Sequence, residues 1–298
     1  MRIIRPNTIT PAMVTACNVP ENDYADWAIG TAYVVGDRCL STHKIYECLV
    51  NNTGYLPEDN TGGTTPKWLD LGYDNRWKMF DQVVGSKTSQ ADSVTVTIEP
   101  GLLDSIAFLD VAADTIDIVM TDPVDGVVYT ETINLIDHTV IVDGYTYFFE
   151  PIVAADAAVL LGIPAYGSAA LAIEFSAAGG TVEVGSIIVG LQKTLGATRY
   201  EPSVGINDYS RKEVDSWGNY TILERTYSKR FSCDFRLPNA NLDDVFRTLA
   251  LYRATPVLWI GADVGFSSML VYGFFKSFLL TVRGPVHTVC TLEIEGLS

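Results

Sequence analysis

The sequence lacks the short motifs that mark common catalytic and nucleotide-binding sites. It contains no HExxH metal motif, no Walker loop and no dinucleotide fingerprint. Its three histidines, His43, His138 and His287, are isolated from one another along the chain. We therefore expect a protein that is not an enzyme and that needs no cofactor or metal. A glycan hydrolase remains a less favoured alternative, because its two carboxylates can come from distant positions; it predicts a deep acidic cleft within residues 86–298.

Positive charge is also scarce. Lys and Arg number 20 and Asp and Glu number 36, so the net charge is 20 − 36 = −16. A surface of this sign repels phosphate backbones and anionic lipids, which argues against a nucleic-acid partner. The start, MRIIRPNTITPAM, lacks the apolar run of a secretory signal. The apolar region 152–175 is interrupted by Asp156, Pro164 and Glu174, so we expect buried strands there and no membrane span.

Cysteine is limited to five scattered residues, and no two have the CxxC spacing of a metal site. We expect free thiols and assembly in a reducing cytoplasm. Cys39 and Cys48 lie on the two sides of an expected hairpin. A turn at Thr42-His43 places Cys39 opposite Tyr46, whereas a shift of one residue would pair the two cysteines. The sequence leaves this register open.

Aromatic residues are concentrated between Tyr24 and Leu71, in a segment otherwise rich in turn-forming residues. Five of them follow Tyr24: Trp27, Tyr33, Tyr46, Tyr55 and Trp68. Gly36-Asp37 precedes one expected strand, and residues 45–50 form the returning strand of a compact hairpin. A polar loop then runs from Asn51 to Pro66. The segment is predicted to fold as a small β module, residues 23–73.

The order of these residues resembles the small chitin-binding modules of carbohydrate-binding families 5 and 12. The shared features are Trp, Ala-Tyr, Gly-Asp, a hairpin ending in Tyr-x-Cys, an aromatic two residues before a proline, and a final Trp. The resemblance implies a structural core of Trp27, Tyr33, Tyr46 and Trp68, with Tyr55 as the residue that stacks on a sugar. The family favours Trp at the position of Tyr55 and Asn-Gly at the hairpin turn. A module that serves only as a spacer or docking surface is the alternative.

The remainder of the chain predicts two β-rich domains. Short strands separated by Pro, Gly and Asp turns indicate a β-sandwich, jelly-roll-like, in residues 74–190. Its end, GGTVEVGSIIVG, is similar to galactose-binding-like sandwiches. Residues 191–298 predict an antiparallel β domain with one packed helix at about 241–254. Residues 1–22, with three prolines, predict an extended arm on a neighbouring subunit or a loose tail.

One strand, from Thr221 to Leu237, is expected to be unusually long. Such length indicates either a bulge or a projection beyond the domain onto a neighbour. Basic residues gather in this region of an otherwise acidic chain, which suggests a docking surface; the alternative is ordinary solvated strand faces. The docking residues proposed from the sequence are Arg211, Lys212, Arg225, Lys229 and Arg230.

The last two thirds also resemble virion proteins of tailed phages. A single helix beside a β-sandwich is similar to the plan of tube and distal-tail proteins, and the pattern from LWIGAD through VYGFFKSF to CTLEIEGL looks like proteins of phage tail modules. The resemblance implies a tail-tip, baseplate or distal-tail subunit in the virion, made in the host cytoplasm. Its partners would be other tail proteins, further copies of itself and possible host cell-surface polysaccharide. A stand-alone lectin-like protein is the alternative.

Overall fold

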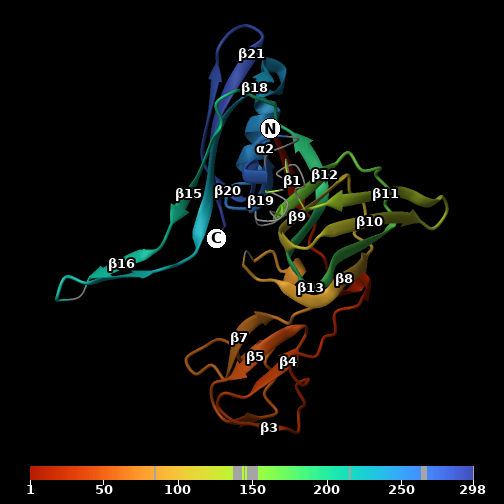
Figure 1. Ribbon diagram of the computed structural model, residues 1–298, viewed down its shortest axis with the longest axis vertical. Helices are drawn as coiled ribbons and strands as arrows, with labels where there is room; N and C mark the ends of the chain where they lie inside the picture. Colours follow the sequence, from red (N-terminus) through yellow and green to blue (C-terminus); the bar gives the residue numbers. More distant parts are fainter. Residues whose placement is uncertain are drawn as a thin grey trace.

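The computed structural model describes residues 1–83, 85–136, 143, 145, 154–214, 216–262 and 267–297. Figure 1 shows a small β module at one end, a large β-rich body and a narrow projection at its side. The expected fold class is confirmed: the protein is mainly β, with a sandwich-like part and an antiparallel sheet on which one helix packs. No helix in these described ranges is long and apolar enough to cross a membrane.

The module is built from two small sheets. One contains β4 (Arg38–Ser41), β5 (Lys44–Cys48) and β7 (Trp68–Tyr73), and the other contains β3 (Ala32–Tyr33) and β6 (Asn52–Thr53). Thr42 and His43 connect β4 to β5 with φ of 45° and 68°, the left-handed conformation that a tight two-residue hairpin turn requires. The register therefore places Cys39 opposite Tyr46.

The sandwich-like part of the body is organised by one long strand. Its strands are β8 (Thr88–Ile98), β9 (Ser105–Ala112), β10 (Thr115–Asp122), β11 (Gly126–Asn134), β12 (Ala157–Leu161) and β13 (Ala170–Thr194). The first part of β13, up to Ser176, pairs with β8 and β10, and the part after Thr181 pairs with β8 and β9. The register between β13 and β8 shifts between Ser176 and Thr181. The sequence also predicts a short strand at residues 146–150, which lies outside the described residues.

Alternate residues of these strands form a single apolar core. Ile118 of β10, Ile173 of β13 and Val96 of β8 are all fully buried, as the period of two in a half-buried strand requires. Across the core, the Phe108 and Phe175 rings meet edge to face with centroids 5.4 Å apart. The two layers are therefore held by interdigitating side chains, as in other face-to-face β packings.

The N-terminal segment corrects the expectation of an extended arm or a loose tail. β1 (Arg2–Pro6) pairs with β13 on one side and with β19 (Val257–Ile260) on the other. Ile3 and Ile4 are both buried, on opposite faces of the sheet. Gly190 permits the close approach, because a Cβ there would lie 2.1 Å from the Arg5 carbonyl oxygen. The N-terminus is thus a central strand of the body.

The C-terminal part continues the same sheet. β18 (Tyr227–Pro238), β20 (Leu270–Val282) and β21 (His287–Gly296) follow β19 in the order β19-β20-β21-β18. Because β1 joins β13 to β19, the boundary expected at residues 190 and 191 falls within β13, in a sheet that runs through both parts. The helix expected at about 241–254 is α2 (Leu242–Leu251). Its Val245 and Leu249 pack against β18 and β21.

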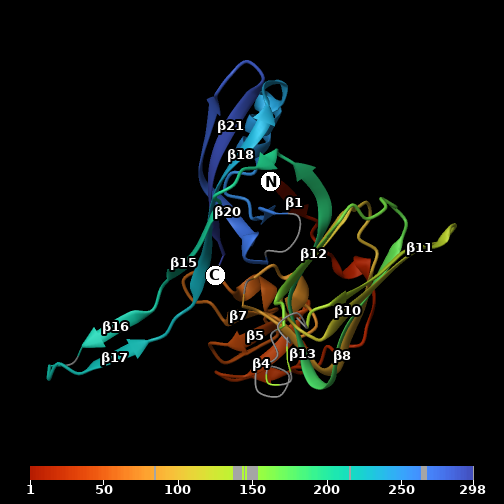
Figure 2. The same cartoon turned by 45° about the horizontal axis from the view of Figure 1, so that its top comes forward.

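The expected long strand at Thr221–Leu237 is divided in two. β17 (Tyr220–Leu223) and β18 are separated by three residues, and β17 pairs with β16 (Arg211–Val214) in a sheet of two strands. β15 (Ser203–Asp208) leads into this ribbon from the edge of β18. We call residues 203–214 and 216–227 the projecting hairpin; Figures 1 and 2 show it extending away from the body. The projection beyond the domain is therefore present, whereas a break between β17 and β18 takes the place of the expected bulge.

Candidate functional site

Four of the five module aromatics lie in its interior. Tyr33, Tyr46 and Trp68 are buried with Cys39 and Cys48, and Trp27 is partly buried against them. The Tyr33 and Trp68 rings meet edge to face at 5.1 Å. The Tyr33 hydroxyl also accepts a hydrogen bond of 2.9 Å from the Ala28 backbone N–H. The structure thus gives these residues a packing role.

All five cysteines are free thiols. Cys39 lies opposite Tyr46, and the Cys48 backbone N–H donates to the carbonyl oxygen of Asp37 at 2.8 Å. The register that the sequence left open is therefore the one that does not pair the two cysteines. Burial raises the pKa of the Cys39 thiol to about 11, which keeps it protonated and poorly reactive near neutral pH.

Tyr55 is the one of these five aromatics that the structure leaves at the surface, with 45% of its area exposed; Tyr24, which precedes them, is 36% exposed. A hydrogen bond holds the Tyr55 backbone in place: the Trp68 indole N–H donates to the Tyr55 carbonyl oxygen at 3.0 Å. The Lys67 ammonium lies over one ring face, 3.6 Å from the centroid. This cation–π contact was not foreseen from the sequence. A sugar that stacks on that ring face must displace Lys67 or use it as a hydrogen-bond donor.

A buried carboxyl at the junction between module and body was also not foreseen. Asp74 follows β7 and is fully buried, and both of its carboxylate oxygens lack a hydrogen-bond partner. Burial, with the nearby charges of Glu21 and Asp23, raises the pKa of this carboxyl to about 6. The charged form is therefore destabilised at neutral pH.

Replacing Asp74 by asparagine is expected to stabilise the protein above pH 6. A carboxyl whose pKa is higher in the folded state stabilises at low pH, and that contribution is lost as the pH rises through about 6. The neutral amide avoids this loss, so the free energy of unfolding should rise by about 2 kcal/mol near pH 8 and change little near pH 4. Denaturant unfolding followed by tryptophan fluorescence measures both values. The exposed Asp59→Asn variant is the control, and an equal gain at both pH values would contradict this assignment.

The five basic residues predicted to form a docking surface do not gather on one face. Arg211 and Lys212 are neighbours in β16, and Lys229 and Arg230 are neighbours in β18, so each pair points to opposite sides of its strand. Arg230 lies 2.7 Å from Glu293, and Lys229 lies 4.0 Å from Asp156. The sequence-based prediction considered only the basic residues, whereas the fold places acidic residues beside Lys229 and Arg230.

The projecting hairpin exposes many large apolar and aromatic side chains among its polar and charged residues. The large ones are Val204, Ile206, Tyr209, Val214, Trp217, Tyr220, Ile222, Leu223 and Tyr227. Trp217 is 88% exposed and Ile222 is 65% exposed. In the described part of the chain, β16 and β17 pair only with each other. A two-stranded ribbon is marginally stable in water, and exposed apolar clusters of this kind mark interaction sites.

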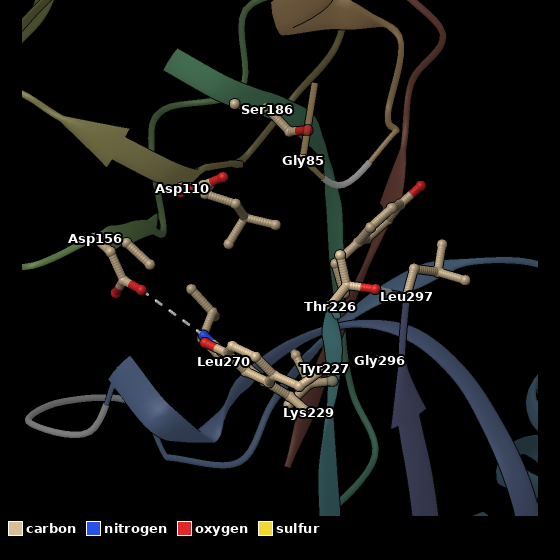
Figure 3. Close-up of a pocket in the computed structure, with 15 residues that line it drawn as sticks. Gly85, Asp110, Asp156, Ser186, Thr226, Tyr227, Lys229, Leu270, Gly296 and Leu297 are labelled. Carbon is tan, nitrogen blue, oxygen red and sulfur yellow. Dashed lines mark ion pairs between the residues drawn. The ribbon is translucent and has the colours of Figure 1, made fainter. Parts of the chain in front are cut away.

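A cavity of about 330 Å³ lies at the root of this hairpin, between β9, β12 and β13 on one side and β18 and β20 on the other (Figure 3). Its walls include Leu109, Leu270 and Leu297. It also contains two carboxylates, but Asp156 lies beside Lys229 at 4.0 Å and Asp110 lies 2.9 Å from Lys87. Each of the two carboxylates that line the cavity is therefore paired with a lysine.

No protein-family model matches this chain, and no curated protein matches it. Within the described ranges, no group of three or more His, Cys, Asp or Glu side chains is arranged to hold a metal ion.

Proposed function

We propose that this protein is a structural subunit of a phage tail, at the tail tip, baseplate or distal tail, that assembles through its β-rich body. The projecting hairpin carries this proposal. It displays nine large exposed apolar and aromatic side chains and two strand edges beyond the body. Such a hairpin is expected to lie on a neighbouring subunit, where burial of each large apolar side chain contributes roughly 1.5–3 kcal/mol.

A second copy of the chain offers complementary strand edges. In the described part of the sheet, β11 ends one side of the strand order and pairs only with β10. Repeated copies arranged by rotational symmetry can each place a hairpin on the next subunit, which closes a ring. Other tail proteins would contact this ring.

The module lies at one end of the molecule, and α2 and the tip of the β20–β21 hairpin lie toward the opposite end (Figure 1). In the proposed assembly it faces outward, and many weak contacts with a cell-surface glycan would add through avidity. Electron microscopy of phage particles labelled with an antibody to residues 24–71 tests this placement. Label at the tail end is expected; particles that contain the protein but bind no antibody would contradict the outward orientation.

A stand-alone lectin-like protein is the second candidate, and exposed Tyr55 favours it. Tyr55→Ala is expected to lower retention on chitin or bacterial polysaccharide about tenfold, because a stacked aromatic ring contributes on the order of 1.4 kcal/mol. Pull-down of native and variant proteins measures the change. Tyr200→Ala removes a fully exposed tyrosine of the body and is the matched control. Equal retention of native protein and Tyr55→Ala would exclude Tyr55 as the ligand residue.

We propose no enzymatic activity. A glycan hydrolase would need a carboxylic acid and a carboxylate that cooperate across a substrate cleft. The cavity at the root of the hairpin contains Asp110 and Asp156, but each lies next to a lysine. This arrangement favours a structural role for both carboxylates.

A further inference from the structure

Three arginines converge on the sheet face that points away from α2. Arg236 lies in β18 between Phe235 and Leu237, whose side chains pack with the helix, so the Arg236 side chain points to the other face. Val289 of β21 is paired with Arg236. Arg199 and Arg283 complete the group, and together with His287 these residues line a cavity of about 360 Å³.

These arginines have no acidic partner in the described part of the chain. Arg199, Arg236 and Arg283 are exposed and form no ion pair there. Asp234, two residues before Arg236 on the same strand, accepts a hydrogen bond from the Thr291 hydroxyl at 2.7 Å. Three unpaired guanidinium groups around one cavity are unexpected in a chain of net charge −16, in which carboxylates are plentiful.

We infer that Arg199, Arg236 and Arg283 form an anion-binding surface that receives carboxylate side chains of a second copy of this chain. Guanidinium groups bind carboxylates through two parallel hydrogen bonds, and several arginines around one cavity can hold more than one carboxylate. Two copies that each carry a charge of −16 repel each other, so a stable contact needs a positive surface on one of them. The inference rests on the proposed self-assembly and assigns a surface to it.

An adjoining cavity provides room for the partner's backbone. It has a volume of about 1010 Å³ and shares Arg199 and Arg236 with the smaller cavity. Met1, Leu195 and Pro238 are among its lining residues. A loop of the second copy can therefore place apolar side chains in the larger cavity while its carboxylates contact the arginines.

The test compares two double variants with equal changes of charge. Arg236→Gln/Arg283→Gln removes two arginines of the surface, and Arg247→Gln/Arg253→Gln removes two exposed arginines at α2. The subunit dissociation constant of each full-length protein is measured by analytical ultracentrifugation at about 50 and about 500 mM salt. The first variant should weaken association on the order of tenfold at low salt, and the control should not.

Each outcome decides the inference. Equal dissociation constants for the native protein and Arg236→Gln/Arg283→Gln would overturn it and leave the proposed assembly intact, whereas a monomeric native protein would overturn both. If the double variant fails to fold, the single variants Arg236→Gln and Arg283→Gln provide the test. Each should weaken association at low salt more than Arg247→Gln does, and dissociation constants equal to that of the native protein would contradict the inference.

Discussion

Replacing Trp68 by alanine is expected to unfold the module while the body stays folded. Trp68 is fully buried, packs edge to face on Tyr33 and donates a hydrogen bond to the Tyr55 backbone. Loss of a buried tryptophan typically costs about 3–5 kcal/mol. The hydrophobic cluster of the module is small, with five buried residues and Trp27, and small domains rarely have more than a few kcal/mol of stability. The substitution should therefore exceed the stability of the module.

Limited proteolysis with mass spectrometry measures this effect, because cleavage should become fast within residues 23–73 and remain slow in the body. Trp217→Ala removes a tryptophan that is 88% exposed and should leave the cleavage pattern of the module unchanged. Trp68→Phe keeps an aromatic ring in the core and should give an intermediate result. A module that resists protease after Trp68→Ala would show that its core does not depend on this residue.

Shortening the projecting hairpin is expected to give a folded monomer. Asp208 and Tyr227 lie directly opposite each other in the register of β15 and β18. Replacing residues 209–226 by Asn-Gly therefore closes a tight hairpin at this pair without altering the sheet. The variant loses most of the exposed apolar side chains that the proposed contact needs, so association should fall by several orders of magnitude.

A single substitution provides a milder version of the same test. Ile222→Gln removes an apolar side chain that is 65% exposed in β17, and Val124→Gln does so at the β10–β11 turn, where Val124 is 89% exposed. Only the first should weaken association. Size-exclusion chromatography with light scattering measures the mass of each variant, and equal masses for all of them would count against the hairpin as the contact.

The parts of the fold that were predictable depend on local pattern. The alternation in β10, the presence of a hairpin between Cys39 and Cys48 and the apolar stripe of α2 are each visible within a short window of sequence. β1 could not be predicted in this way, because a five-residue central strand is buried on both faces and shows no alternation. The path of β13 also depends on distant partners. Its Gly179-Gly180 pair looks like a turn, yet one strand continues through it.

The candidate sites differ in the same way. Tyr55 was located by its place before Pro57 in a motif, but Lys67 over its ring depends on how the loop folds back. Arg199, Arg236 and Arg283 are far apart in sequence and meet only through the arrangement of β18, β20 and β21. The burial of Asp74 could not be predicted from the sequence, because an acidic residue that follows a strand usually lies in solvent.

The solution mass of the native chain tests the central claim most directly. One subunit has a mass of 32.6 kDa. At micromolar concentration and low salt, light scattering should give at least twice this value, because the projecting hairpin and the arginine surface are each proposed to contact a neighbouring copy. A mass of 32.6 kDa at every concentration would contradict assembly through these surfaces.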